Sequence, residues 1–203
     1  MRPQTLDQLV GQHHLVGEGN FLRTAIGADE VPSLILWGPP GCGKTSLAHV
    51  IAHSTNAFFA PFSAVLGGLK DVRELVRAAS VRARRGERTI LFVDEIHRFN
   101  KSQQDAFLPH VEQGVVTLVG ATTENPSFAL NAALLSRCRV VRLNAIHKQD
   151  LSGLLQGVLV DVERGLGGSG ITATAEVFEG LGRFRKVREA GRDHFVLFSS
   201  ISD

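Results

Sequence analysis

The sequence predicts an α/β fold built around a parallel β-sheet. Short apolar runs alternate along the chain with segments whose apolar residues recur at helical spacing, and this alternation favours βαβ units. The chain has 203 residues, of which 43% are hydrophobic and 21% are charged, as in ordinary globular proteins. A chain of this length can bury a substantial core, so it needs no disulfide or metal to stabilise it.

The predicted strands are the short apolar runs at residues 33–37, 58–63, 89–93, 115–119 and 138–143. Pro61 lies within the second of them and confines that strand to an edge of the sheet, because proline lacks the N–H that a central strand donates. Between the second and third runs, Val72, Leu75, Val76 and Ala79 follow the i, i+3, i+4, i+7 pattern of an amphipathic helix.

After Asn144 the chain changes character. Residues 148–162 have a helical pattern and are followed by a glycine-rich stretch at residues 165–170. We therefore predict a domain boundary near Asn144, with an α/β domain over residues 1–144 and a helical region from residue 145.

Charge and cysteine content restrict where this chain works. The formal net charge is only +2, so the overall charge neither favours nor excludes a nucleic-acid partner. Two cysteines, Cys42 and Cys138, are too few for a disulfide framework and fit a reducing compartment. No stretch approaches about 20 apolar residues, and the N-terminus lacks the apolar segment of a signal peptide. These features predict a cytoplasmic protein that has no membrane partner.

A glycine-rich loop follows the first predicted strand and opens a helical segment. It matches the pattern G-x-x-x-x-G-K-[ST] with Gly38, Pro39, Pro40, Gly41, Cys42, Gly43, Lys44 and Thr45. In such loops the glycines let backbone N–H groups turn toward phosphate oxygens, and the helix N-terminus adds its dipole. The lysine supplies charge to the β- and γ-phosphates, and the threonine hydroxyl reaches Mg²⁺. We predict that these residues, with Ser46 behind them, bind ATP.

Two carboxylates follow the strand predicted at residues 89–93. An isolated Asp-Glu pair after a strand is usually the start of a solvated loop, but the phosphate loop upstream favours a functional pair. A carboxylate at Asp94 can hold Mg²⁺ together with Thr45, and Glu95 can orient the attacking water. We therefore predict Asp94 as a magnesium-binding residue and Glu95, with Lys44, as catalytic residues.

Two other motif-like patterns in the sequence carry less weight than the phosphate loop and the carboxylate pair. The segment Asp94-Glu95-Ile96-His97 also resembles the DExH box of helicases, which need two tandem motor domains, and no second one is evident. His49 and His53 have the spacing of helical zinc ligands but lack the intervening glutamate of H-E-x-x-H. We interpret this pair as ordinary helix residues.

Two polar residues near predicted strand ends each have two interpretations. Thr123 follows the strand after the carboxylates, where a hydroxyl can sense the γ-phosphate, although Thr at a strand end also serves simple turns. Arg137 precedes the last predicted strand and is either a surface residue or a finger that reaches the ATP of a neighbouring subunit. The residues alone leave these alternatives open.

Several unbroken blocks of the sequence resemble one known family. They are ILFVDEIHRFNK at residues 90–101, SQQDAFLPHVE at 102–112, GATTENPSF at 120–128 and LLSRCRV at 134–140. Together with residues 34–41, these blocks are similar to the replication-associated recombination protein A family of bacteria, relatives of the eukaryotic Werner helicase-interacting protein. The resemblance extends from residue 2 to about residue 179. It implies an AAA+ ATPase, akin to clamp loaders and to the branch-migration motor.

For the fold, the resemblance implies a three-layer sandwich with a parallel five-stranded sheet in the order 5-1-4-3-2, followed by a partial helical lid. For the site, it implies that the phosphate loop is Walker A and that Asp94 and Glu95 form Walker B. Thr123 then matches the sensor-1 position, and Arg137 matches the arginine finger.

The resemblance further implies that Val10, Gly11 and Gln12 belong to the N-terminal segment that lines the adenine pocket, with Val10 and Gly11 as binding residues. It also implies ATP and Mg²⁺ as cofactors, and ATP hydrolysis that depends on DNA at forks, gaps and single-stranded ends. The expected setting is replication-fork maintenance, recombination and repair at the nucleoid. A homotetramer and a single-stranded DNA-binding protein are the expected protein partners.

After residue 179 the sequence departs from the family pattern. The family continues through a helical lid with a Gly-Asp-Ala-Arg sensor-2 motif and then a tetramerisation region, and no Gly-Asp-Ala-Arg occurs here. We interpret residues 145–180 as the start of the lid and residues 181–203 as the divergent tail of a truncated or frameshifted product, with no clean helical or strand period. The alternative to an active ATPase is therefore a nucleotide-binding fragment without turnover.

Overall fold

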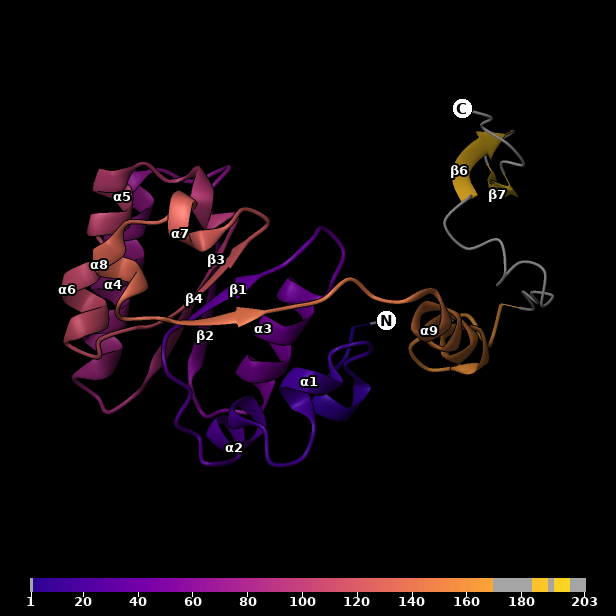
Figure 1. The fold of residues 1–203 in the computed structure, drawn as a ribbon, viewed down its shortest axis with the longest axis horizontal. Coiled ribbons are helices and arrows are strands. Elements are labelled where there is room, and N and C mark those ends of the chain that lie inside the picture. Colours follow the sequence, from indigo (N-terminus) through magenta and orange to yellow (C-terminus); the bar gives the residue numbers. More distant parts are fainter. Residues whose placement is uncertain (1, 170–183, 190–191, 198–203) are drawn as a thin grey trace. The chain divides into compact units, whose positions relative to one another are not determined.

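The computed structural model describes residues 2–169, 184–189 and 192–197. The chain divides into two compact units, Arg2–Ala145 and a second unit that begins at Ile146. The first unit contains a five-stranded sheet with helices on both faces (Figure 1). Among the described residues, no helix combines the length and the apolar character that crossing a bilayer requires.

The sheet of the first unit consists of β1 (Leu34–Trp37), β2 (Phe58–Ser63), β3 (Thr89–Asp94), β4 (Thr117–Thr122) and β5 (Arg139–Arg142). All neighbouring strands are parallel, and their order is β2-β3-β4-β1-β5. Read from the other edge this is 5-1-4-3-2, so the predicted sheet is confirmed. Pro61 lies in the edge strand β2, as its missing N–H requires.

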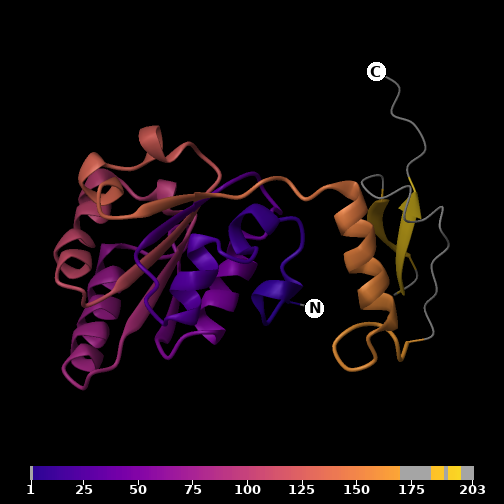
Figure 2. The same ribbon diagram turned by 60° about the horizontal axis from the view of Figure 1, so that its bottom comes forward.

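Helices cover both faces of the sheet, which gives the three layers that were predicted (Figures 1 and 2). Short elements open the chain, and one face carries η1 (Leu6–Gln8), α1 (His13–Val16), α2 (Phe21–Gly27) and α3 (Lys44–His53). The other face carries α4 (Leu69–Ala83), η2 (Ile96–Arg98), α5 (Lys101–Asp105), α6 (Leu108–Glu112) and α8 (Ala132–Leu135), with α7 (Pro126–Ala129) before α8. Each face has its own hydrophobic core.

The central strand β1 contributes side chains to both cores. Leu34 and Leu36 are fully buried in the core on the α3 side, and Ile35 is fully buried in the core on the α4 side. Successive side chains of a strand point to opposite faces, so a strand covered on both faces is apolar throughout. This explains why the segment reads as one continuous apolar run.

Strand β4 extends further than the sequence indicates. The predicted run ended before Gly120, because glycine usually interrupts a strand, whereas the observed strand continues to Thr122. A Cβ added at Gly120 would lie 2.9 Å from Ile96 Cδ1 and 3.0 Å from Ile35 Cδ1. Glycine therefore lies inside the strand because the packing of these two side chains leaves no room for a larger residue.

The second unit contains α9 (Lys148–Val160), within the predicted helical segment. It also contains β6 (Phe184–Glu189) and β7 (Arg192–Leu197), which pair antiparallel. The sequence pattern indicates no regular element in the segment of β6 and β7. Hairpin pairing uses main-chain N–H and C=O groups, which every non-proline residue supplies, so it does not depend on a side-chain period. Residues 170–183, which include the last part of the predicted start of the lid, lie outside the described residues.

Asp29 joins three segments of the first unit at the end of the sheet opposite the phosphate loop. Its carboxylate pairs with Arg88, and it accepts hydrogen bonds from Asn56 N at 3.2 Å and Asn56 Nδ2 at 3.1 Å. Its backbone has a φ of +57°, a conformation that aspartate and asparagine tolerate better than most residues. The hydrogen bond from Arg88 lowers the pKa of Asp29 below its ordinary value, with smaller contributions from Asn56.

Replacing Asp29 with asparagine should remove the charge and keep the backbone conformation. Because the pKa of Asp29 is lower in the folded state, its ionised carboxylate stabilises the folded state at pH values above the ordinary aspartate pKa. This stabilisation is lost as the pH falls through the pKa of the folded state. The stability difference between wild type and Asp29→Asn should therefore be largest at neutral pH and shrink below pH of about 4. The pair is partly exposed, so we expect less than about 1 kcal/mol. Urea unfolding across the pH range measures it, and a difference that grows toward low pH would contradict the assignment.

Candidate functional site

The carboxyl ends of β1, β3 and β4 surround a cavity of about 560 Å³. Parallel strands bring their carboxyl ends to the same edge of a sheet, which is where α/β proteins bind ligands. The cavity is lined by Pro40, Gly41, Gly43, Lys44, Thr45, Ser46, Asp94, Glu95, His97, Arg98, Thr123 and Glu124. The glycine loop, the two carboxylates and the threonine after β4 thus face one space, although they lie far apart in the sequence.

The loop between β1 and α3 has a backbone that only glycine adopts readily. Gly41 and Gly43 have φ values of +73° and +97°, in the left-handed region that side chains disfavour. Gly38 is restricted by space instead, because a Cβ there would lie 2.5 Å from the backbone oxygen of Leu143. The ten-residue helix α3 begins at Lys44, so its free N–H groups and its dipole face the cavity side of the loop.

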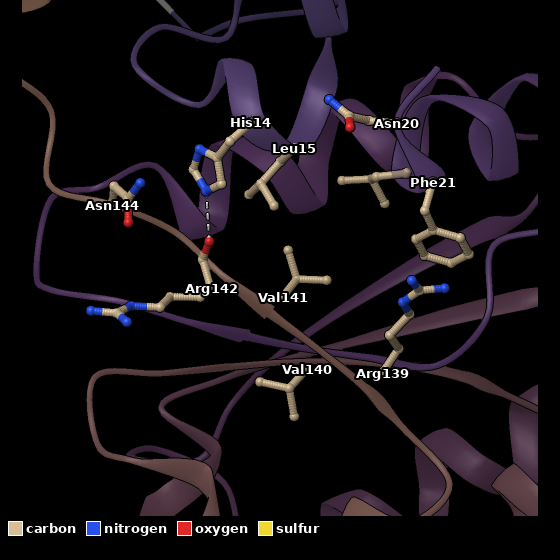
Figure 3. Close-up of a pocket in the computed structure, with 10 residues that line it drawn as sticks. His14, Leu15, Asn20, Phe21, Arg139, Val140, Val141, Arg142 and Asn144 are labelled. Atoms are coloured by element: carbon tan, nitrogen blue, oxygen red, sulfur yellow. Dashed lines mark hydrogen bonds between the residues drawn. The ribbon is translucent and has the colours of Figure 1, made fainter. Parts of the chain in front are cut away.

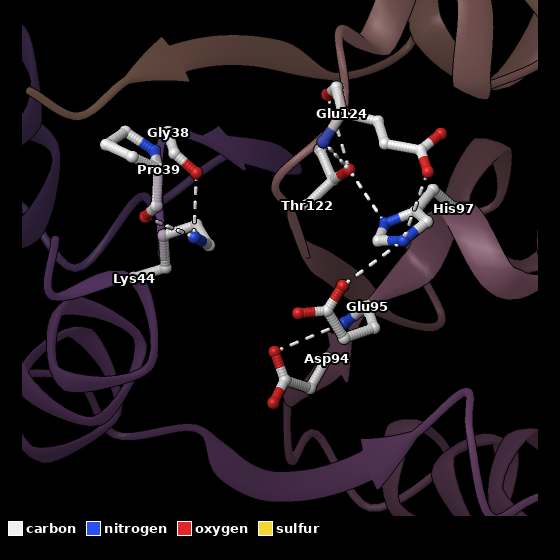
Figure 4. Close-up of polar contacts among 8 residues, drawn as sticks. All are labelled: Gly38, Pro39, Lys44, Asp94, Glu95, His97, Thr122 and Glu124. Atoms are coloured by element: carbon white, nitrogen blue, oxygen red, sulfur yellow. Dashed lines mark hydrogen bonds and ion pairs between the residues drawn. The ribbon is translucent and has the colours of Figure 1, made fainter. Parts of the chain in front are cut away.

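The Lys44 side chain is held inside the loop. Its Nζ donates hydrogen bonds to the backbone oxygens of Gly38 at 2.8 Å and Pro39 at 2.9 Å (Figure 4). Lys44 is only 8% exposed, so its positive charge is kept beside the cavity rather than in solvent. An ammonium group in this position is suited to bind an anion in the cavity.

Asp94 and Glu95 occupy the turn at the end of β3. Glu95 has a φ of +54°, an uncommon conformation for a residue with a side chain. Its backbone N–H donates to Asp94 Oδ1 at 3.2 Å. Such backbone strain is frequent at functional sites, and here it follows the strand that ends at the carboxylate Asp94 (Figure 4).

Several predicted site residues do not line this cavity. Within the phosphate loop, Gly38, Pro39 and Cys42 support it from outside: two accept hydrogen bonds from Lys44, and Cys42 is 1% exposed. Val10 and Gly11 line neither this cavity nor the one beside β5. Their role at the adenine remains a prediction from the resemblance.

Arg137 also lies away from the cavity of its own chain. Its Nη2 pairs with Glu112 Oε1 at 2.5 Å, and its Nη1 donates to the backbone oxygen of Ala133 at 2.8 Å and to Ser136 Oγ at 3.1 Å. The side chain is 38% exposed. Arg137 is thus paired with Glu112 at the surface and is not among the residues that line this cavity.

A smaller cavity of about 380 Å³ lies beside β5 and α1 (Figure 3). His14 Nε2 forms a hydrogen bond with the backbone oxygen of Arg142 at 3.0 Å, and the Arg139 guanidinium lies 3.5 Å from the centroid of the Phe21 ring. The arginine side chains that line this cavity thus already have partners within the chain: Arg139 lies over Phe21, and Arg142 lies over Trp37.

The two histidines with zinc-like spacing have other partners. His49 Nε2 accepts a hydrogen bond from Arg2 Nη1 at 2.9 Å, and His53 Nδ1 contacts the backbone oxygen of His49 at 2.8 Å. Burial and the charges of Arg2 and His53 lower the pKa of His49. Among the described residues, no group of three or more potential ligands is placed to hold a metal ion.

Gln12 supports the site through contacts that the sequence did not indicate, although it belongs to the Val10-Gly11-Gln12 segment that resembles the N-terminal box of the family. Its side chain is fully buried. Nε2 donates to the backbone oxygens of Cys42 at 3.1 Å and Asn144 at 2.7 Å, and Oε1 accepts from Asn144 N at 3.0 Å. One side chain thus joins the N-terminal segment, the phosphate loop and the chain that leaves β5.

Gln12→Leu should destabilise the first unit strongly. Leucine has a similar volume but leaves the backbone groups of Cys42 and Asn144 without partners, and each unsatisfied buried group costs about 1–3 kcal/mol. We expect a loss of about 3 kcal/mol in the free energy of unfolding, measured by urea denaturation. Gln113→Leu, at an exposed position after α6, is the matched control and should change stability little. Equal effects of the two variants would contradict the role of Gln12.

The site combines strand β1, a glycine loop with a buried lysine, helix α3 and two carboxylates at the end of β3. This combination defines a P-loop nucleotide-binding domain. The chain belongs to the ATPase family associated with various cellular activities (AAA), whose model matches residues 34–145.

The chain is homologous to replication-associated recombination protein A. It is 53% identical over 176 residues to that protein of Escherichia coli (strain K12), and the match covers 87% of this chain and 39% of the relative. It is 56% identical over 167 residues to the Coxiella burnetii protein of that name, covering 82% of this chain and 38% of the relative. The resemblance inferred from the sequence blocks is confirmed. The chain spans less than half the length of these relatives.

The structural comparison identifies the same class of domain. The Thermotoga maritima RuvB Holliday junction branch migration motor matches with a TM-score of 0.64 and 31% identity, over 78% of this chain and 53% of that chain.

A eukaryotic relative is similar in sequence. ATPase WRNIP1 of Dictyostelium discoideum is 46% identical over 159 residues, which cover 78% of this chain and 18% of that protein.

Proposed function

We propose that the chain binds ATP with Mg²⁺ in the cavity at the carboxyl end of the sheet and hydrolyses the γ-phosphate bond. The observation that carries this proposal is the convergence of Lys44, Thr45, Asp94, Glu95 and Thr123 on one cavity from two strand ends and a helix. These are the residue types that phosphoryl transfer uses to bind phosphate, hold the metal and orient water.

The residues fit the proposed ligand. The left-handed glycines shape a backbone cradle, and the N-terminus of α3 and Lys44 favour negative charge within it. Thr45 and Asp94 would hold Mg²⁺, because hydroxyl and carboxylate oxygens are the ligands that this hard cation prefers. When bound, the metal neutralises charge on the phosphate oxygens. Glu95 then orients the attacking water, and Thr123 contacts the γ-phosphate side of the cavity.

We further propose that turnover depends on DNA and serves replication-fork maintenance, recombination and repair at the nucleoid. This step rests on the relatives, whose names refer to replication-associated recombination. DNA with forks, gaps or single-stranded ends is the expected substrate class. A single-stranded DNA-binding protein is an expected neighbour on such DNA.

We also propose that the chain acts as a homo-oligomer, with a tetramer as the expected form. Arg137 does not line the cavity of its own chain and is partly exposed. An arginine that stabilises developing charge is often supplied by a neighbour, so this placement supports a site completed between two copies.

ATP turnover by the full chain, measured without DNA and with intact duplex, gapped duplex or forked DNA, tests the function. We expect turnover that gapped and forked DNA increase more than intact duplex does. Nucleotide binding without turnover on any DNA would instead support the nucleotide-binding fragment. Turnover that is the same with every DNA would contradict the DNA-dependent part alone.

A further inference from the structure

His97 lies between the ends of β3 and β4, and the proposed hydrolysis gives it no role. It belongs to η2, and the preceding Ile96 is fully buried in the core on the α4 side of the sheet, where its Cδ1 packs over Gly120. The His97 side chain is only 4% exposed, yet it lines the cavity. A buried imidazole next to a catalytic carboxylate has its orientation determined by its partners (Figure 4).

The partners of His97 come from both strand ends. Nδ1 lies 3.0 Å from Thr122 Oγ1, at the end of β4. Nε2 lies 3.3 Å from Glu95 Oε2 and 3.6 Å from Glu124 Oε1. His97 therefore connects Glu95, which follows β3, with two residues around Thr123, which follows β4.

The hydrogen bonds around Thr122 indicate which ring nitrogen carries the proton. Thr122 Oγ1 accepts a hydrogen bond from Glu124 N at 3.0 Å. Its hydroxyl proton then has two acceptors, His97 Nδ1 at 3.0 Å and the backbone oxygen of Glu124 at 3.3 Å, of which Nδ1 is the nearer. Nε2 faces two carboxylate oxygens, which accept and do not donate when ionised. A neutral imidazole with its proton on Nε2 satisfies both sides of the ring. The other neutral tautomer would direct a lone pair at two carboxylates.

A single N–H thus faces two acceptors on different segments. Glu95 is 34% exposed and Glu124 is 62% exposed at their side chains, so both can reorient. A bond to Glu95 occupies Oε2 and leaves Oε1 for a water in the cavity. A bond to Glu124 leaves Glu95 without this restraint.

We propose that His97 is a positioning residue that holds Glu95 in its hydrolytic orientation through Nε2–H, and that Glu124 competes for this proton. The proposal rests on the proposed ATP hydrolysis. It makes the orientation of Glu95 depend on the segment that carries Thr123, because Glu124 follows it directly. Contact between Thr123 and nucleotide that moves Glu124 away from His97 would leave the N–H to Glu95.

Two substitutions of His97 separate its two contacts. The amide of asparagine reaches the position of Nδ1 but not that of Nε2, whereas the amide of glutamine reaches the position of Nε2. We expect His97→Asn to lower kcat about 10- to 100-fold, as expected for a misplaced catalytic group, with little change in KM. His97→Gln should restore kcat to within a few-fold of wild type. His110→Asn and His110→Gln, on α6 away from the cavity, are the matched controls.

Glu124→Ala tests the competition. Removal of the second acceptor should raise kcat above that of wild type, because Nε2–H is then left to Glu95 alone. Equal losses in His97→Asn and His97→Gln would overturn the positioning role, because a role in packing alone would not distinguish them. A loss of kcat in Glu124→Ala as large as that in His97→Asn would overturn the competition.

A spectroscopic measurement distinguishes failure of this inference from failure of the proposed function. Long-range ¹H–¹⁵N correlation spectra of ¹⁵N-histidine-labelled protein report which ring nitrogen of His97 carries the proton, whether or not ATP is hydrolysed. We expect the proton on Nε2 in wild type and an altered Nε2 signal in Glu95→Gln and in Glu124→Ala. A proton on Nδ1 in wild type, or an Nε2 signal insensitive to both variants, would overturn the inference.

Discussion

Replacing Arg137 with alanine is expected to lower ATP turnover about 10³- to 10⁵-fold, the range in which arginine fingers contribute. Nucleotide binding should be retained, because Arg137 does not line the cavity of its own chain. Steady-state turnover and titration with a fluorescent nucleotide measure the two effects. Arg139→Ala is a matched control, since Arg139 lies two residues further on and packs over Phe21 rather than beside Glu112. Similar losses in both variants would contradict a specific role.

The same variant tests whether the arginine acts between copies. Arg137→Ala keeps an intact Glu95, and Glu95→Gln keeps an intact Arg137. Mixed oligomers of the two variants contain some interfaces at which both groups are present, so they should regain part of the activity that each variant lacks. No recovery in oligomers shown to be mixed would argue against action in trans.

Replacing Lys44 with alanine is expected to abolish measurable ATP binding. The variant removes the positive charge beside the cavity and leaves the backbone oxygens of Gly38 and Pro39 without their donor. Glu95→Gln should instead bind ATP and fail to turn it over, because the amide keeps the shape of the side chain but lacks the carboxylate that orients the attacking water. Fluorescent nucleotide titration and turnover assays together measure this contrast.

Lys70→Ala, at an exposed position in α4, is the control for a lost surface charge and should leave ATP affinity unchanged. Near-normal affinity in Lys44→Ala would contradict the assignment of the phosphate loop. Loss of binding in Glu95→Gln would show that Glu95 supports the nucleotide itself rather than the attacking water.

Much of the fold could be predicted because its signals are local. The apolar run that became β1 is continuous because both faces of that strand are covered, and Pro61 by itself assigned β2 to an edge. The helix α4 follows directly from its apolar spacing. Boundaries were less predictable: Gly120 interrupts the pattern in the sequence, and only the side chains of Ile35 and Ile96 explain its place inside β4.

The candidate site divides in the same way. The glycine loop, Lys44 and the carboxylates after β3 could be predicted from the residues, because phosphate binding restricts residue types over a few consecutive positions. The folded structure was needed to show that Gln12 bonds to Asn144, 132 residues away, that His97 bonds to Thr122, 25 residues away, and that Arg137 pairs with Glu112. Such contacts depend on the order of the strands and on how helices pack across the sheet, and no local pattern of residue types encodes that order.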